Sequence, residues 1–131
     1  MGLHIYIDTI PHAEQRYPTV GDYWEDALVS GETKREVRVS DMSNEDYEFL
    51  VAIHEQIEQH LCKKRGISEQ SITDFDVKFE NSRTSESLAE PGNHPDAPYH
   101  KEHVFATEIE RRLAEELGID WATYDKFVDS L

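Results

Sequence analysis

The segment Leu50-Val-Ala-Ile-His-Glu-Gln-Ile-Glu-Gln-His-Leu61 decides how this chain folds, because its apolar residues recur with the period of an α-helix. At about 100° per residue, five side chains project within about 60° of His54: Tyr47, Leu50, Val51, Ile57 and Leu61. Glu58 lies one turn further on and about 40° from His54. An imidazole and a carboxylate therefore share the face that must be buried. Burial without partners is costly for both groups, so we expect each to find a hydrogen bond, a counter-charge or a metal ion.

The helix around this segment is predicted to span residues 43–65. Ser43, followed by Asp46 three residues later, is similar to a capping box, and cationic residues before Gly66 fit the last turn and the stop. His60 falls about 120° from His54 and is expected in solvent. The segment therefore lacks the HExxH zinc motif, in which the two histidines stand four residues apart.

The first third of the chain has the pattern of a small sheet. Residues 4–10 alternate apolar and polar side chains up to Pro11, as a half-buried strand does, and residues 36–40 alternate in the same way after a turn. Residues 12–22 contain Pro18 and Gly21 and are expected to form an ordered loop. The sequence thus predicts an antiparallel sheet of two or three strands.

The rest of the chain favours helices. Residues 67–80 fit either a strand or a helix behind a serine cap at Ser68 or Ser71, and we favour the helix. Residues 81–98 are irregular, whereas residues 98–117 form a second strong helix, and Asp120 caps a short helix over residues 121–129. We therefore expect one domain over residues 1–131 with an α+β fold, in which a small N-terminal antiparallel sheet precedes three or four helices.

The second strong helix, like the first, carries a histidine and a glutamate on its apolar face. Around Ala106 as the centre of its apolar face, Glu110 lies about 40° and His103 about 60° away. If the two helices pack together, four polar side chains share one pocket between apolar walls: His54, Glu58, His103 and Glu110. The alternative is a hydrogen-bonded core network that holds no metal.

A single metal ion would use only part of this set. His54 and Glu58 are one turn apart, about 6 Å along the helix axis, and suit one ion. Either His103 or Glu110 would be the third ligand, because these two are about 10.5 Å apart. Nitrogen and oxygen ligands without thiolate suit zinc better than iron or manganese. Glu55 lies about 100° from His54, at the rim, where it could act as a catalytic base towards water.

Composition excludes several classes of function. The chain has 28 acidic and 13 basic residues and a net charge of −15, which repels nucleic-acid phosphates and anionic membranes. Its apolar runs are too short for a membrane span, so we expect a cytoplasmic protein. Cys62 is the single cysteine and is expected to be a packed thiol. Four other polar residues are weaker site candidates, more typical of surface or cap positions: His100, Asp74, Asp76 and Glu80.

Several stretches together resemble a family of small proteins encoded by tailed phages and prophages. The resemblance covers nearly the whole chain and is carried by residues 11–22, 51–58, 75–80, 90–93, 97–103 and 105–110. It implies a phage origin and the cytoplasm of the host cell, and it implies no particular reaction.

A second resemblance is to the gluzincin metallopeptidases, in which a sheet precedes a helix carrying HExxH and a later helix supplies a glutamate ligand. His54 and Glu55 match the first half of that motif, but Glu58 stands where its second histidine belongs. The leading hypothesis is a zinc-binding protein of this plan, with possible hydrolase activity through Glu55. The alternative is a non-enzymatic acidic accessory protein that binds a host protein. A magnesium-dependent nucleotide pyrophosphohydrolase fits less well, because magnesium prefers oxygen ligands to histidine.

Overall fold

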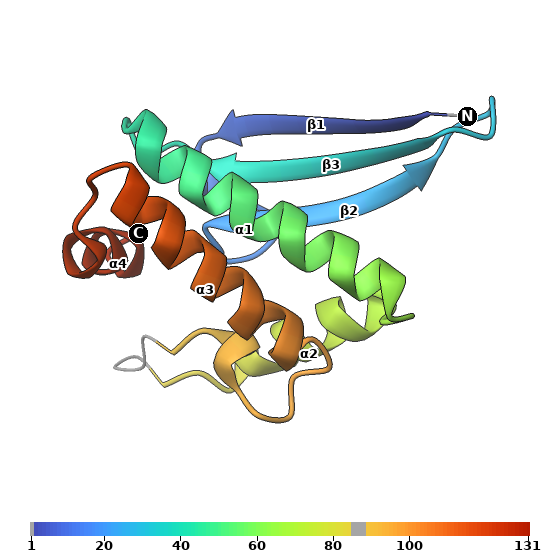
Figure 1. Ribbon diagram of the computed structural model, residues 1–131. Helices are drawn as coiled ribbons and strands as arrows, with labels where there is room; N and C mark the ends of the chain where they lie inside the picture. The colour runs from blue at the N-terminus through green and yellow to red at the C-terminus, as the bar shows by residue number, and fades with distance from the viewer. Residues whose placement is uncertain (1, 85–88) are drawn as a thin grey trace.

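The computed structural model describes residues 2–84 and 89–131 of the chain. A three-stranded sheet comes first and four α-helices follow, which confirms the predicted α+β fold (Figure 1). The elements are β1 (Leu3–Ile10), a 3-10 turn η1 (His12–Glu14), β2 (Gly21–Ala27), β3 (Thr33–Ser40), α1 (Glu45–Lys64), α2 (Glu69–Asn81), a 3-10 turn η2 (Pro91–Asn93), α3 (His100–Glu116) and α4 (Trp121–Asp129).

The sheet is mixed rather than wholly antiparallel. Its strand order is β1-β3-β2, with β1 parallel and β2 antiparallel to β3. β2 and β3 form a hairpin through a turn in which Gly31 adopts φ +84°, a conformation that favours glycine. β2 runs opposite to both other strands, and β3 lies between them, so β1 and β3 must be parallel. β2 itself was expected to be loop at its start, because Pro18 and Gly21 obscure the alternation that follows them.

The helix caps differ slightly from those predicted. Asn44, not Ser43, caps α1, and its side chain accepts the Tyr47 backbone N–H at 3.0 Å. Ser43 adopts φ +51° and so belongs to the turn before the helix. Ser68 caps α2, in agreement with the helical alternative for this stretch. α3 begins at His100, two residues after the predicted start, because the tight turn after Ala97 precedes it.

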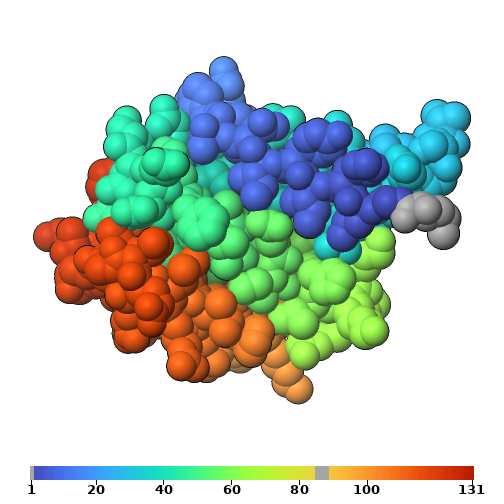
Figure 2. All heavy atoms as spheres, turned by 45° about the horizontal axis from the view of Figure 1, so that its top comes forward, coloured from blue at the N-terminus to red at the C-terminus, as the bar shows by residue number. Residues whose placement is uncertain are grey.

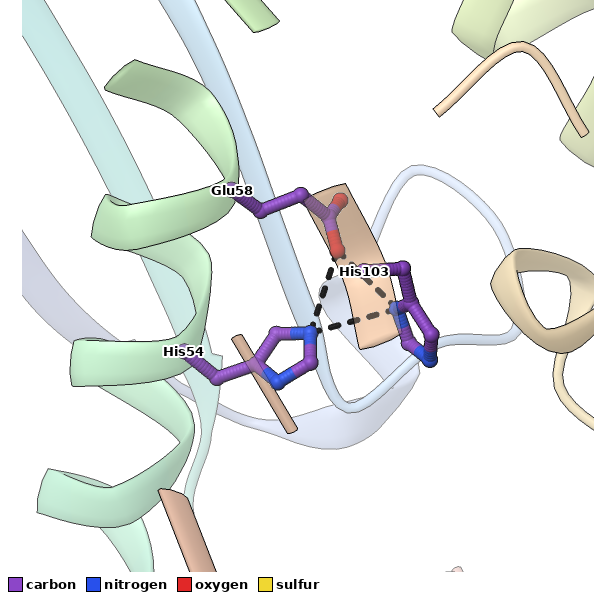
Figure 3. Close-up of side chains that lie close together, drawn as sticks. All are labelled: His54, Glu58 and His103. Atoms are coloured by element: carbon purple, nitrogen blue, oxygen red, sulfur yellow. Dashed lines mark hydrogen bonds and ion pairs between the residues drawn. The ribbon is translucent and has the colours of Figure 1, made fainter. Parts of the chain in front are cut away.

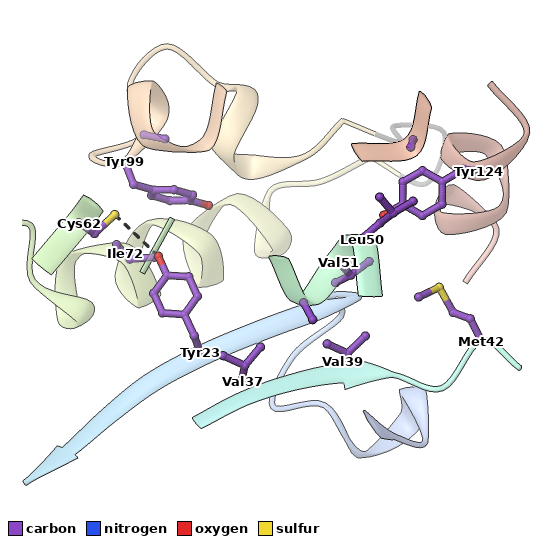
Figure 4. Packing of buried hydrophobic residues seen from close by; sticks show 13 residues of the cluster. Tyr23, Val37, Val39, Met42, Leu50, Val51, Cys62, Ile72, Tyr99 and Tyr124 are labelled. Carbon is purple, nitrogen blue, oxygen red and sulfur yellow. Dashed lines mark hydrogen bonds between the residues drawn. The ribbon is translucent and has the colours of Figure 1, made fainter. Parts of the chain in front are cut away.

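The core lies between the sheet and α1, and between α1 and α3. Val37 and Val39 of β3 and Leu50 of α1 are completely buried, and the labelled side chains in Figure 4 converge in this layer. The helices gather on one face of the sheet, and α1 packs on β2 and β3 (Figure 1). Burial of this apolar layer fixes the rotation of α1, so that His54 and Glu58 point towards α3.

Candidate metal centre

His54 and Glu58 of α1 meet His103 and Glu110 of α3 in the buried interface between these two helices. All four side chains are buried despite their polarity. Leu50 and Val51 hold the α1 residues inward, and the completely buried Ala106 lets α3 approach closely. The helical periodicity therefore places all four candidates where the sequence predicts, although they do not play equivalent parts.

Three atoms form a small triangle at the centre of the interface (Figure 3). His54 Nε2 lies 3.1 Å from Glu58 Oε2, and His103 Nδ1 lies 3.0 Å from the same oxygen. The two ring nitrogens are 3.3 Å apart. Each of these residues can offer one ligand atom to a shared metal ion, and all three residues are buried. Glu110 is outside the triangle.

Each imidazole is anchored from behind by a carboxylate. His54 Nδ1 is 2.7 Å from Glu110 Oε1, and His103 Nε2 is 3.0 Å from Glu90 Oε2. Tyr124 of α4 donates to the other oxygen of Glu110 at 2.6 Å. An ionised carboxylate only accepts hydrogen bonds, so both outer ring nitrogens carry protons. This arrangement fixes the orientation of both rings.

The anchored rings leave the centre of the triangle short of positive charge. With their outer nitrogens protonated, neutral imidazoles would turn two lone pairs towards each other and towards the Glu58 carboxylate. Three acceptors at such distances repel one another in a buried site. Positive charge at the centre removes that repulsion, either as protons on His54 and His103 or as a metal cation.

The pKa values of the metal-free cluster show the protonated alternative. Burial lowers the pKa of both histidines, but hydrogen bonds to carboxylates outweigh it: the pKa of His54 is well above its ordinary value, and that of His103 is raised to about 9. Burial raises the pKa of Glu58, and hydrogen bonds from His103 and His54 outweigh it and lower that pKa to about 2. These directions favour an ionised Glu58 that accepts hydrogen bonds from both imidazoles.

Tyr23 links the sheet to this cluster. Its hydroxyl donates to Glu58 Oε1 at 3.0 Å and lies 3.8 Å from the thiol of Cys62 (Figure 4). The thiol is buried, and burial raises its pKa to about 12, which agrees with the packed thiol expected from the sequence. Glu58 thus has one oxygen held by the sheet and the other directed at the histidines.

Glu55 lies apart from the triangle but lines the same cleft, which has a volume of about 570 Å³. Its carboxylate rests against the backbone of Gly21, where a Cβ atom on that residue would come within 2.6 Å of it. No hydrogen bond to this carboxylate is present among the residues that the structure describes. Burial and the neighbouring charge of Glu58 raise the pKa of Glu55 well above its ordinary value. The side chain predicted to act as a base is thus a poorly solvated carboxyl group at the cleft wall.

Two residues of this region were not predicted to take part. Glu90 comes from the irregular stretch before η2, where no periodicity marks a residue as inward. Gly92 of η2 packs directly on the imidazole of His103, since a Cβ there would lie 2.5 Å from Nδ1. The segment before α3 therefore closes one side of the cluster with a carboxylate and a glycine.

Asp76 is buried, which contradicts its assignment to ordinary surface chemistry. Tyr99 donates to Oδ1 at 2.5 Å and Tyr17 to Oδ2 at 3.0 Å, and burial raises the Asp76 pKa to about 6. A helical projection could have revealed it, because Asp76 lies one turn from the buried Ile72.

The remaining candidates lie outside the cluster. Asp74 accepts from Gln70 on the surface of α2, and Glu80 pairs with Arg83. His100 Nδ1 contacts the carbonyl oxygen of Gly92 at 3.0 Å. The exposed side chain of His60 contacts Arg35 at 3.0 Å. None of these groups belongs to the triangle.

Comparison of the chain with family models, with curated proteins and with solved structures gives no match in any of the three. Within residues 2–84 and 89–131, no helix combines the length and the apolar character needed to cross a membrane. The chemistry of the cluster is therefore what indicates the function.

Proposed function

We propose that the protein binds one divalent transition-metal ion, zinc in the first instance, through His54 Nε2, His103 Nδ1 and Glu58 Oε2. The observation that carries this proposal is the convergence of three ligand atoms within 3.0–3.3 Å of one another, with both histidines anchored by carboxylates. Two ligand atoms at tetrahedral angles, each about 2.0–2.1 Å from zinc, lie about 3.3 Å apart. The triangle therefore has the dimensions of one face of such a site.

The surroundings also fit a metal centre. Histidine ligands of metals commonly donate their second ring N–H to a carboxylate, which fixes the tautomer and increases ligand basicity. Here Glu110 accepts the second ring N–H of His54, and Glu90 accepts that of His103. Two imidazoles and one carboxylate suit zinc better than magnesium or calcium, which prefer oxygen ligands.

Metal analysis of tag-free protein is the experiment that tests the proposal. We expect about one zinc per chain after purification or after zinc addition, and a lower melting temperature in chelator. His54→Ala should lose the metal, whereas His60→Ala, on the exposed side of the same helix, should retain it. Absence of bound metal together with no thermal response to added zinc would leave the cluster as a hydrogen-bonded core network.

A hydrolytic role is the second candidate, and the position of Glu55 favours it. Two histidines and one glutamate form the donor set of zinc hydrolases such as thermolysin. Here Glu58 and His103 exchange the positions that glutamate and the second histidine have in the gluzincin plan. A zinc ion in such a donor set supplies Lewis acidity that makes water a nucleophile near neutral pH. Glu55, at the wall of the cleft, would accept the proton that water loses.

The test of this role separates turnover from metal binding. Hydrolysis of a panel of peptide, ester and phosphoester substrates is measured for the zinc-loaded protein and for Glu55→Gln. We expect Glu55→Gln to abolish any turnover and to retain one zinc per chain. Equal turnover in the two proteins would show that Glu55 is not the base.

A further inference from the structure

β1 is an edge strand whose apolar side chains are not covered. Leu3, Ile5 and Ile7 are 51%, 41% and 45% exposed, although they lie on the same sheet face as the completely buried Val37, the partner of Ile7 in the register. The reason is the placement of α1, which packs on β2 and β3. Figure 2 looks onto this side of the molecule, where β1 (dark blue) lies at the surface beside α1 (green).

The outer backbone edge of β1 is also open within the described part of the chain. Its inner edge bonds to the β3 side through even-numbered residues: the carbonyl of Gly2 accepts from Thr33, and that of Ile10 accepts from Asp41. Because a strand alternates its hydrogen-bonding direction, the odd-numbered residues turn their N–H and C=O groups outward. Neither proline nor lysine interrupts residues 3–10. Exposed edges in monomeric proteins usually carry such protection against pairing.

We propose that β1 pairs antiparallel with β1 of a second copy of this chain, centred on Tyr6, to form a continuous six-stranded sheet. A two-fold axis perpendicular to the sheet keeps the apolar faces of both copies on the same side. In this register Ile5 lies opposite Ile7 of the second copy through outward-facing backbone groups. His4 lies opposite Asp8 of the second copy, so an imidazole and a carboxylate, which can share a hydrogen bond, meet at both ends of the pairing.

Other registers that keep the faces matched are less favourable. Shifting the centre to Ile7 places His4 opposite Ile10 and Asp8 opposite Tyr6, which removes the pairing of imidazole with carboxylate. Centring the pair on Ile5 shortens it. Each copy carries a net charge of −15, so long-range repulsion opposes association, and added salt should strengthen the dimer.

Sedimentation or light scattering of the full chain tests the interface. We expect a mass of twice 15.2 kDa at tens of micromolar, stronger association in salt, and a folded monomer for Ile5→Lys. Val29→Lys is the matched control, because Val29 is fully exposed in the β2–β3 turn and is not part of the paired strand, and it should remain dimeric. A monomeric wild-type chain would overturn the proposal, as would an Ile5→Lys protein that stays dimeric.

Cross-linking tests the register. Under mild oxidation Tyr6→Cys should form a disulfide-linked dimer, since the two substituted positions face each other across the axis. Asp8→Cys should not, because its counterpart lies four residues along the paired strand, about 13 Å away. The native Cys62 is 2% exposed and does not compete. Cross-linking of Asp8→Cys in place of Tyr6→Cys would refute the register.

Discussion

Substitution of two neighbouring glutamates of α1 should destabilise the protein at one position and not at the other. Glu58→Gln replaces a carboxylate that accepts from His54, His103 and Tyr23 with an amide, whose NH₂ group would face donors. Glu55→Gln removes the charge of a carboxylate that has no hydrogen bond among the described residues. The two changes are equal in size and chemistry and stand one turn apart, so each is the control for the other.

The magnitude for Glu58 follows from its pKa. Folding lowers this pKa from 4.5 to about 2, and each unit corresponds to about 1.36 kcal/mol, so ionised Glu58 contributes about 3 kcal/mol to the free energy of unfolding. This contribution belongs to the whole cluster, since both histidines share it. It is fully present above pH 4.5 and disappears as the pH falls through 2. The pKa of Glu55 is raised instead, so its ionised form opposes folding at neutral pH.

Urea denaturation of chelator-treated protein at pH 7 measures both effects. We expect the Glu58→Gln midpoint to fall by about 2 M, since small domains lose about 1–3 kcal/mol of stability per molar urea. The Glu55→Gln midpoint should stay unchanged or rise. Comparable losses in the two variants would refute the reasoning, as would a Glu58→Gln protein as stable as wild type.

Three further outcomes are expected. Glu110→Gln should weaken zinc binding about 10- to 100-fold in a competition titration while retaining one zinc per chain, because Glu110 orients His54 without joining the triangle; full loss of the metal would make it a ligand. In chelator, the free energy of unfolding should fall as the pH rises from 6.5 through 9, since the protonated His103 ring stabilises the fold and loses its proton over this range. Zinc affinity, measured by titration at several pH values, should increase over the same range, because zinc binds the deprotonated ring nitrogen. Gly92→Ala should displace the His103 ring, destabilise the protein by about 1–3 kcal/mol and weaken zinc binding. Unchanged denaturation and zinc titrations would show that η2 moves to accommodate the methyl group without cost.

The sequence was informative where structure is local. His54 and Glu58 belong to one helix, and His103 and Glu110 to another, so a projection at 100° per residue suffices to turn them inward. It cannot assign their parts, because whether His103 or Glu110 completes the triangle depends on the rotation and offset of two helices that are distant in sequence. Glu90 lies in an irregular segment without a period, so no sequence signal marked it.

The sheet shows the same limit. The alternation in residues 4–10 and 36–40 predicted β1 and β3, but pairing depends on which strand lies between the others. The antiparallel expectation was wrong for β1 and β3, because β2 intervenes between them in sequence and pairs on the far side of β3. The burial of Asp76 could have been predicted from the helical projection of α2, but its hydrogen bonds could not, since its phenol partners Tyr17 and Tyr99 come from other segments.

The two carboxylates behind the histidines differ in their access to water, which gives the cluster a dry end and a wet end. The side chain of Glu110 is 11% exposed and sealed by Tyr124, whereas that of Glu90 is 43% exposed. If zinc binds as proposed, we expect the protons that it displaces to leave along His103 and the exposed Glu90, because Tyr124 and Glu110 close the side of His54. We expect proton exchange between the cluster and solvent to pass through Glu90. A substitution of Glu90 should therefore change the exchange rate without altering Glu110 and Tyr124 on the buried side of the site.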